Sequence, residues 1–199
     1  MGCLKNVIRA VVITLAVVGF LSLGGKDLIG GMLGNWFNPS QDVMMERAKK
    51  VGDFSKINDE FEIEKAAGIM GYNAVVSEHK ASGQKMFVVD PKDKVILTKT
   101  DIRSDNIEEK LQAALKKVKY QAISVDDIKV TKHGVMYSYG EEIPYVKFEA
   151  KVKKLPIGDV GGIVSVAEAN DGSQRLLVSI NEKNKYSQLI SDEFFRKIK

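Results

Sequence analysis

The stretch YVKFEAKVK, residues 145–153, decides the fold class of this chain, because apolar and charged side chains alternate along it without a break. A period of two places the two kinds of side chain on opposite faces of a β-strand. A strand with one charged face needs a solvated side, which favours an antiparallel sheet over a parallel one. The inward set is Val146, Phe148, Ala150 and Val152, and the outward set is Lys147, Glu149, Lys151 and Lys153.

Further strand-like segments lie on both sides of this one. Turn residues separate them, including Ala81–Gln84, Pro91–Asp93 and Asn170-Asp171-Gly172, and such spacing is typical of hairpins and meanders. We therefore expect consecutive strands to be neighbours in the sheet. The expected strands are residues 74–79, 85–90, 95–100, 128–133, 135–139, 145–153, 163–168 and 175–180.

Four segments show the apolar spacing of amphipathic helices: residues 40–51, 59–70, 105–119 and 187–197. The third is the clearest, because Asp105 and Glu108 form a capping-box-like start and lysines occupy its last turn. Strands outnumber helices, and strands do not alternate regularly with helices. The sequence thus predicts an α+β domain, a mainly antiparallel sheet with helices packed on one face, preceded by an N-terminal transmembrane or signal helix.

The N-terminal segment Ala10–Gly25 carries no charge and follows Lys5 and Arg9. As a helix it would rise about 24 Å, and Val7, Ile8 and a snorkelling Arg9 would extend it toward the roughly 30 Å of a bilayer core. Positive charge before the apolar run predicts a cytoplasmic N-terminus and a translocated domain. The expected membrane residues are Ala10, Val11, Val12, Ile13, Leu15, Val17, Val18, Phe20, Leu21 and Leu23.

The same segment also fits a cleaved signal peptide, with Ser22-Leu23-Gly24 as a small-x-small cleavage site. In that alternative the protein is secreted or periplasmic. Both interpretations divide the chain into a membrane or signal segment (1–25), an apolar glycine-rich linker (26–39) and an extracytoplasmic domain (40–199). The linker contains Trp36-Phe37, which suits a membrane interface and favours a retained, single-pass anchor.

Composition excludes several classes of function. The net charge is +4, but basic and acidic residues are interspersed, as on a solvated surface, so no nucleic-acid partner is expected. The single cysteine, Cys3, precedes the apolar run, so the domain can form no disulfide and perform no thiol chemistry.

The sequence contains no recognisable catalytic signature. Its two histidines, His79 and His133, are far apart and belong to no metal-binding motif, so no metal or cofactor is expected. Ser77 and Lys80 match S-x-x-K in form only, because in a strand they face opposite sides. Whether the protein is an enzyme stays open, with the balance toward a non-catalytic role.

Tyrosines surround a pair of glutamates in the second half of the domain. Tyrosine combines apolar area with a polar tip, which suits recognition surfaces, although half-buried strands carry it as well. We therefore expect a membrane-anchored envelope protein that binds another envelope protein or assists its assembly. The alternative is a small-ligand-binding module with a pocket between sheet and helices. The candidate interaction residues are Tyr137, Tyr139, Glu141, Glu142 and Tyr145.

Overall fold

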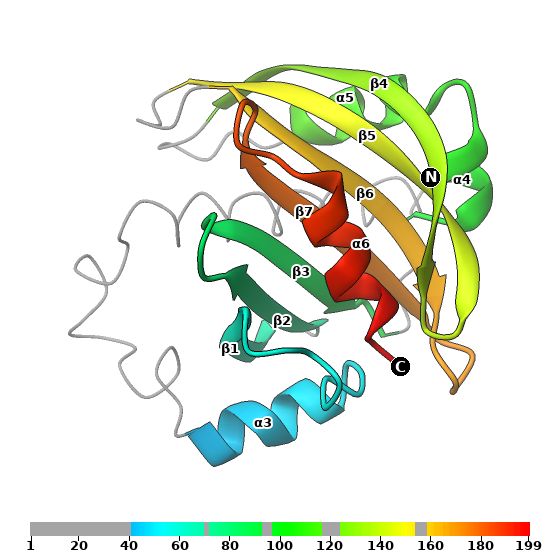
Figure 1. The fold of residues 1–199 in the computed structure, drawn as a ribbon. Helices are drawn as coiled ribbons and strands as arrows, with labels where there is room; N and C mark the ends of the chain where they lie inside the picture. The colour runs from blue at the N-terminus through cyan, green and yellow to red at the C-terminus, as the bar shows by residue number, and fades with distance from the viewer. Residues whose placement is uncertain (1–40, 70–71, 93–96, 117–123, 154–158) are drawn as a thin grey trace.

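The computed structural model describes residues 41–69, 72–92, 97–116, 124–153 and 159–199. Seven strands form one sheet in the order β1-β2-β3-β7-β6-β5-β4, and every neighbouring pair is antiparallel (Figure 1). The prediction of a mainly antiparallel sheet is thus confirmed. The strands are β1 (Phe61–Ile69), β2 (Tyr72–His79), β3 (Gln84–Asp90), β4 (Ser124–Ser138), β5 (Glu141–Lys153), β6 (Val160–Glu168) and β7 (Gln174–Glu182).

The three central strands are buried on both faces. In β3, Phe87 belongs to one core cluster while its neighbour Val88 belongs to a second. Leu176 and Leu177 divide in the same way in β7. Since successive side chains of a strand point to opposite sides, the two clusters lie on opposite faces of the sheet.

Helices cover both faces of this sheet. Helices α4 (Lys99–Arg103) and α5 (Ile107–Lys116) bring Ile102, Ile107 and Leu111 into the first cluster. Helices α3 (Gln41–Lys49) and α6 (Gln188–Arg196), with the segments that follow them, supply residues of the second cluster such as Ala48 and Phe194. Figure 1 shows α6 in front of β6 and β7, and α5 behind β4 and β5. The prediction of helices on one face is therefore wrong, because continuous apolar runs such as residues 86–89 must be covered on two sides.

Most predicted elements are confirmed, with three corrections. Residues 59–70, expected as a helix, contain strand β1, which pairs with β2 throughout its length. Lys99 and Thr100, expected in a strand, begin α4 behind a capping box formed by Thr98 and Asp101. The segments 128–133 and 135–139 form one strand, β4, because Gly134 does not interrupt pairing with β5.

A buried polar network fixes α6 on the sheet. The Gln84 amide nitrogen donates to Ser179 Oγ (3.0 Å), Ser191 Oγ (3.0 Å) and Ser187 O (2.9 Å). The Gln84 carbonyl oxygen accepts the N–H of Ser187 (2.9 Å). The Gln84, Ser179 and Ser191 side chains are fully buried. Because each has hydrogen-bond partners, the network orients α6 at little desolvation cost.

The predicted membrane or signal segment and the linker, residues 1–39, lie outside the described residues. Within the described part of the chain, no helix combines the length and the apolar character that crossing a bilayer requires.

Candidate functional site

Strand β4 forms one margin of the sheet, and among the described residues β5 is its only strand neighbour. The two strands are joined by the two-residue turn Tyr139-Gly140, in which both residues have positive φ (51° and 80°). Positive φ at both positions is the geometry of a type I′ hairpin, whose twist matches that of the flanking strands. The turn lies directly before Glu141 and Glu142, which begin β5.

The register of β4 against β5 identifies the backbone groups that point out of the sheet. Val135 lies opposite Pro144, which has no N–H and therefore cannot form a mutually hydrogen-bonded pair. The Pro144 carbonyl instead accepts the hydroxyl of Ser165 in β6 (2.7 Å). Antiparallel pairs alternate between bonded and non-bonded, so the N–H and C=O groups of His133, Val135 and Tyr137 all face away from β5.

The earlier half of the same margin is closed by helix α5. Gln112 Oε1 accepts the N–H of Ile128 (2.9 Å), and Glu108 Oε2 accepts the N–H of Val130 (2.7 Å). These side chains, one helical turn apart, occupy the donors that another strand would need. No such hydrogen bond from the described residues reaches positions 133, 135 and 137. We call this stretch, residues 132–138, the open edge.

A β-bulge separates the two halves of β4. The register shifts between Val130 and Lys132, which leaves Thr131 as an extra residue. Ile128 and Val130 pack in or against the first core cluster, and Val135 and Tyr137 lie on the same face further along the strand, where they are 60% and 52% exposed. Large apolar side chains with this exposure, beside unpaired backbone groups, are typical of a surface that binds another chain.

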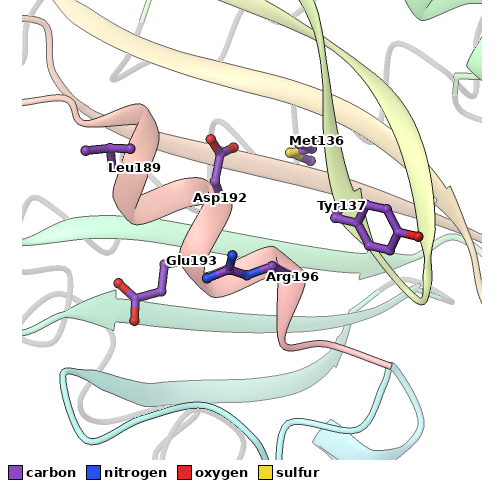
Figure 2. Close-up of a pocket in the computed structure, with 6 residues that line it drawn as sticks. All are labelled: Met136, Tyr137, Leu189, Asp192, Glu193 and Arg196. Carbon is purple, nitrogen blue, oxygen red and sulfur yellow. The ribbon is translucent and has the colours of Figure 1, made fainter.

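An open groove of about 460 Å³ runs between the open edge and α6. Figure 2 shows that its lining comes from these two elements alone, with the ring of Tyr137 projecting beyond β4. Leu189, at the start of α6, is 79% exposed, the largest value among the exposed large hydrophobic side chains of the described residues. The lining residues are Met136, Tyr137, Leu189, Asp192, Glu193 and Arg196.

Charge along the open edge is uneven. Asp192 and Glu193 are engaged, because Gln188 donates to Asp192 (2.8 Å), and Asn58 (2.8 Å) and Lys197 (3.1 Å) donate to Glu193. Lys132, Arg196 and Glu142, in contrast, form no salt bridge within the described part of the chain. The surface therefore presents unneutralised positive charge beside the edge and negative charge just after the turn.

The structure places the three candidate tyrosines in different surroundings. Tyr137 is at the surface, whereas Tyr139 and Tyr145 are each 6% exposed. Tyr145 packs over Gly134, and a β-carbon at that glycine would lie 2.6 Å from the tyrosine ring. Burial raises the pKa of both Tyr139 and Tyr145. Tyr139 and Tyr145 therefore support the surface from its buried side. Of the three tyrosines, only Tyr137 can contact a partner directly.

The two candidate glutamates also differ. Glu142 is exposed, opposite Tyr137 in the register. Glu141 accepts hydrogen bonds from Lys99 Nζ (2.6 Å) and the N–H of Glu168 (3.1 Å). Burial raises the pKa of Glu141, but these two hydrogen bonds together lower it below the ordinary value of 4.5. Glu141 thus secures the turn to α4 and β6, while Glu142 stays accessible.

The two histidines do not meet. The ring of His79 bonds Ser82 Oγ (2.9 Å) and packs against Phe61, with the ring centroids 5.2 Å apart. His133 lies exposed on β4, at the opposite margin of the sheet from β1 and β2. Among the described residues, no cluster of three or more His, Cys, Asp or Glu side chains could hold a metal ion.

Sequence reasoning missed Val135 and the α6 residues of the groove. Leu189 is the residue from which the groove could have been predicted. Ile190, Phe194 and Ile198 form the apolar stripe of its helix, and Leu189 lies outside that stripe. An apolar residue off the buried stripe is a candidate contact residue.

The spaces between sheet and helices are filled with side chains. On the α5 face, Phe87, Ile107 and Leu111 pack in one cluster, each no more than 2% exposed. On the α6 face, Phe194 stacks within 5.4 Å of Phe195 and within 5.2 Å of Phe61, measured between ring centroids. The groove beside β4 is therefore a surface feature and not a gap in either core cluster.

Comparison with known proteins adds no assignment to this geometry: no protein-family model matches the chain, and a search of curated proteins finds no significant match.

Proposed function

We propose that this protein is a membrane-anchored, non-catalytic protein of the cell envelope, and that its folded domain binds another protein chain by strand addition at the open edge of β4. In strand addition, an incoming extended segment pairs with the free N–H and C=O groups of an edge strand, while side-chain pockets provide specificity. The single observation that carries the proposal is the outward direction of three alternate backbone pairs, at His133, Val135 and Tyr137.

The contrast between the two halves of β4 supports this interpretation. Natural edge strands are protected by charged side chains, bulges or covering elements. The earlier half has all three: Lys129, the bulge at Thr131, and the α5 side chains that bond Ile128 and Val130. The later half carries Val135 and Tyr137 without such cover from the described residues. An edge protected over only half of its length suits a partner that pairs with the other half.

The groove supplies the side-chain component of such an interface. Met136, Tyr137 and Leu189 offer apolar contact beside the free backbone groups. Arg196 offers a charge that no described carboxylate neutralises. A surface with an apolar centre and a charged rim matches the usual composition of protein–protein interfaces.

The membrane part of the proposal rests on the sequence. Residues 10–25 are uncharged and follow two basic residues, and the apolar linker, residues 26–39, leads directly into the domain. Such an anchor would hold the open edge near a bilayer and raise the local concentration of any partner in the same membrane.

The alternative, an extracytoplasmic module that binds a small ligand between sheet and helices, is the second candidate. Its support is the sheet–helix architecture alone. The dense packing of both core clusters favours protein contact over an internal ligand pocket.

Two measurements test the proposal in the native membrane. The first is the intact mass of the protein in membrane and soluble fractions, with protease added outside intact cells. Full-length protein in the membrane, with its domain cleaved from outside, is expected. A protected domain would overturn the proposed topology, and a soluble species beginning near Gly25 would replace the anchor with a signal peptide.

The second measurement is the size of the native complex after extraction in a mild detergent. Val135→Lys places a charge in the centre of the open edge, and Val43→Lys makes the same change at an exposed valine on α3. We expect the wild type and V43K to migrate as a complex and V135K as a single chain. Migration of the wild type as a single chain, or equal behaviour of the two lysine variants, would contradict binding through this edge.

A further inference from the structure

We propose that the occupant of the open edge is the same edge of a second copy of this chain, paired antiparallel about a two-fold axis through Val135. The inference rests on the proposed function and names its partner. Such pairing joins two seven-stranded sheets into one continuous sheet, with both copies of α6 on the same face.

The pattern of free backbone groups is self-complementary. In this register the Val135 residues of the two copies lie opposite each other, and each His133 lies opposite the partner's Tyr137. All three positions have N–H and C=O groups that face outward, so each pairing is of the mutually hydrogen-bonded kind. The two edges thus satisfy each other completely, and no outward group within the stretch is left unpaired.

The two ends of the open edge also match. At one end α5 closes the margin by bonding Ile128 and Val130. At the other end the chain leaves the margin at the Tyr139-Gly140 turn. In the register centred on Val135, the partner's turn arrives at the position where α5 begins to cover β4. A longer extended peptide would collide with α5, whereas a second copy ends at that point.

Charge favours the antiparallel two-fold arrangement. The basic residues Lys132 and His133 precede Val135, and the acidic residues Glu141 and Glu142 follow the turn. Antiparallel pairing places the basic half of each edge against the acidic end of the other. Lys132 comes opposite the partner's Ser138, which pairs with the partner's Glu141 in the same sheet.

A second polar pair lies on the other face. His133 comes opposite the partner's Tyr137, whose own cross-strand neighbour is the partner's Glu142. Lys132, His133 and Glu142 have no salt-bridge partner within the described part of one copy. Lys132 therefore comes near the partner's Glu141, whose salt bridge to Lys99 can stay in place, and His133 comes near the partner's Glu142.

Three mutually bonded residue pairs form a small interface, so the association is weak for chains in free solution. Anchoring in one membrane would raise the effective concentration of the second copy and favour pairing. The inference therefore predicts a dimer in the membrane or in detergent micelles at high protein concentration.

Cysteine cross-linking measures the register directly, with the full-length chain in detergent micelles and Cys3→Ser as background, so that no other cysteine is present. Mutually bonded residues of antiparallel strands have Cα atoms about 5.5 Å apart, within the range a disulfide spans. Val135→Cys is thus expected to form a disulfide-linked dimer under mild oxidation.

Three further variants test the register and the background rate. In the proposed register the two copies of Tyr137 are four residues out of line, about 14 Å along the strands, so Tyr137→Cys alone should not cross-link. Combining His133→Cys with Tyr137→Cys should restore the dimer. Val43→Cys, at an exposed valine on α3, reports random collision. Cross-linking of Y137C as fast as V135C, or of V135C no faster than V43C, would overturn the inference.

The outcomes also separate this inference from the proposed function. If V135K dissociates the native complex but V135C does not cross-link in the purified chain, the edge binds a different protein and the self-pairing inference is wrong. If the native protein is a single chain and V135C does not cross-link, both are wrong. Light scattering of V135P gives a second measurement, because proline removes the central donor while the β4–β5 pairing retains all its hydrogen bonds.

Discussion

The hydroxyl of Tyr139 donates a hydrogen bond to the carbonyl oxygen of Val51, 2.8 Å away, across 88 residues of sequence. The same carbonyl accepts Arg175 Nε at 2.8 Å. The N–H of Tyr139 in turn bonds Ile198 O at 3.0 Å. The turn at the end of the open edge is thereby tied to the loop after α3 and to the segment after α6.

Tyr139→Phe should destabilise the domain by about 1 kcal/mol, because it removes the hydroxyl but leaves the ring buried. The Val51 carbonyl keeps its bond from Arg175, which limits the loss. Chemical denaturation measures the change as a shift of the unfolding midpoint. Tyr137→Phe, at a 52% exposed tyrosine of the same strand, should leave the midpoint unchanged. Equal shifts in the two variants would show that the hydrogen bond contributes nothing.

Arg175→Met should be far more damaging, at about 3–5 kcal/mol, because it leaves a buried carboxylate without its cation. Arg175 is 3% exposed and lies 3.3 Å from Asp90, which is 8% exposed. Thermal unfolding of R175M is the measurement. Arg175→Lys should recover little of the loss, since a lysine cannot reach Asp90 and the Val51 carbonyl together. Full recovery by lysine would mean that charge alone matters at this position.

Gly134→Ala should destabilise the open edge by about 1–3 kcal/mol, because the new β-carbon would overlap the ring of Tyr145. Hydrogen exchange of the β4 and β5 amides would show the loosening locally. The double variant with Tyr145→Ala should be less unstable than the sum of the single changes, since the small side chain removes the overlap. Additive effects would indicate that the two residues do not restrain each other.

Stability should fall in acid partly through Asp101, whose carboxylate accepts hydrogen bonds from Lys110 (2.5 Å) and from the N–H and hydroxyl of Thr98 (both 2.9 Å). Burial raises the pKa of Asp101, but these bonds together lower it below the ordinary value of 3.8. The folded state therefore binds fewer protons than the unfolded state. Its contribution is fully present above the ordinary pKa and is lost as the pH falls through the lower folded value.

The measurement is the free energy of unfolding of the wild type and of Asp101→Asn from about pH 6 to about pH 3. The gap between the two proteins should be largest near pH 6 and should narrow toward pH 3, because asparagine does not titrate. A constant gap would show that the Asp101 contribution does not depend on its charge.

The sequence predicts strands better than it predicts which surfaces they bury. Segments such as residues 145–153 show a clear period of two and are placed correctly, whereas residues 59–70 show the apolar spacing of a helix although they contain β1. Pairing with β2 outweighs that local preference, and only the assembled sheet provides it. The adjacent apolar residues 86–89 indicate burial on both faces of the sheet.

The candidate surface was predictable only in part. Tyr137 and Glu142 follow from local pattern, but the exposure of Val135 depends on where the cover of β4 by α5 ends, after Val130. The groove forms only because α6, which begins 50 residues after the end of β4, lies beside that strand. Neither the bulge at Thr131 nor the position of α6 beside β4 produces a local periodic pattern in the sequence from which it could be predicted.

The bulge at Thr131 has a consequence for how this surface could change over time. Val130 lies opposite Phe148 and Lys132 opposite Lys147, so Val135 and Tyr137 stay on the same face as Ile128 and Val130 although the numbering changes from even to odd. Deleting Thr131 would leave every pair with β5 in place and would remove only the local bend and twist of the strand. A one-residue change in length at this position therefore alters no side-chain face, whereas a one-residue slip in a regular part of β4 would move side chains to the opposite face.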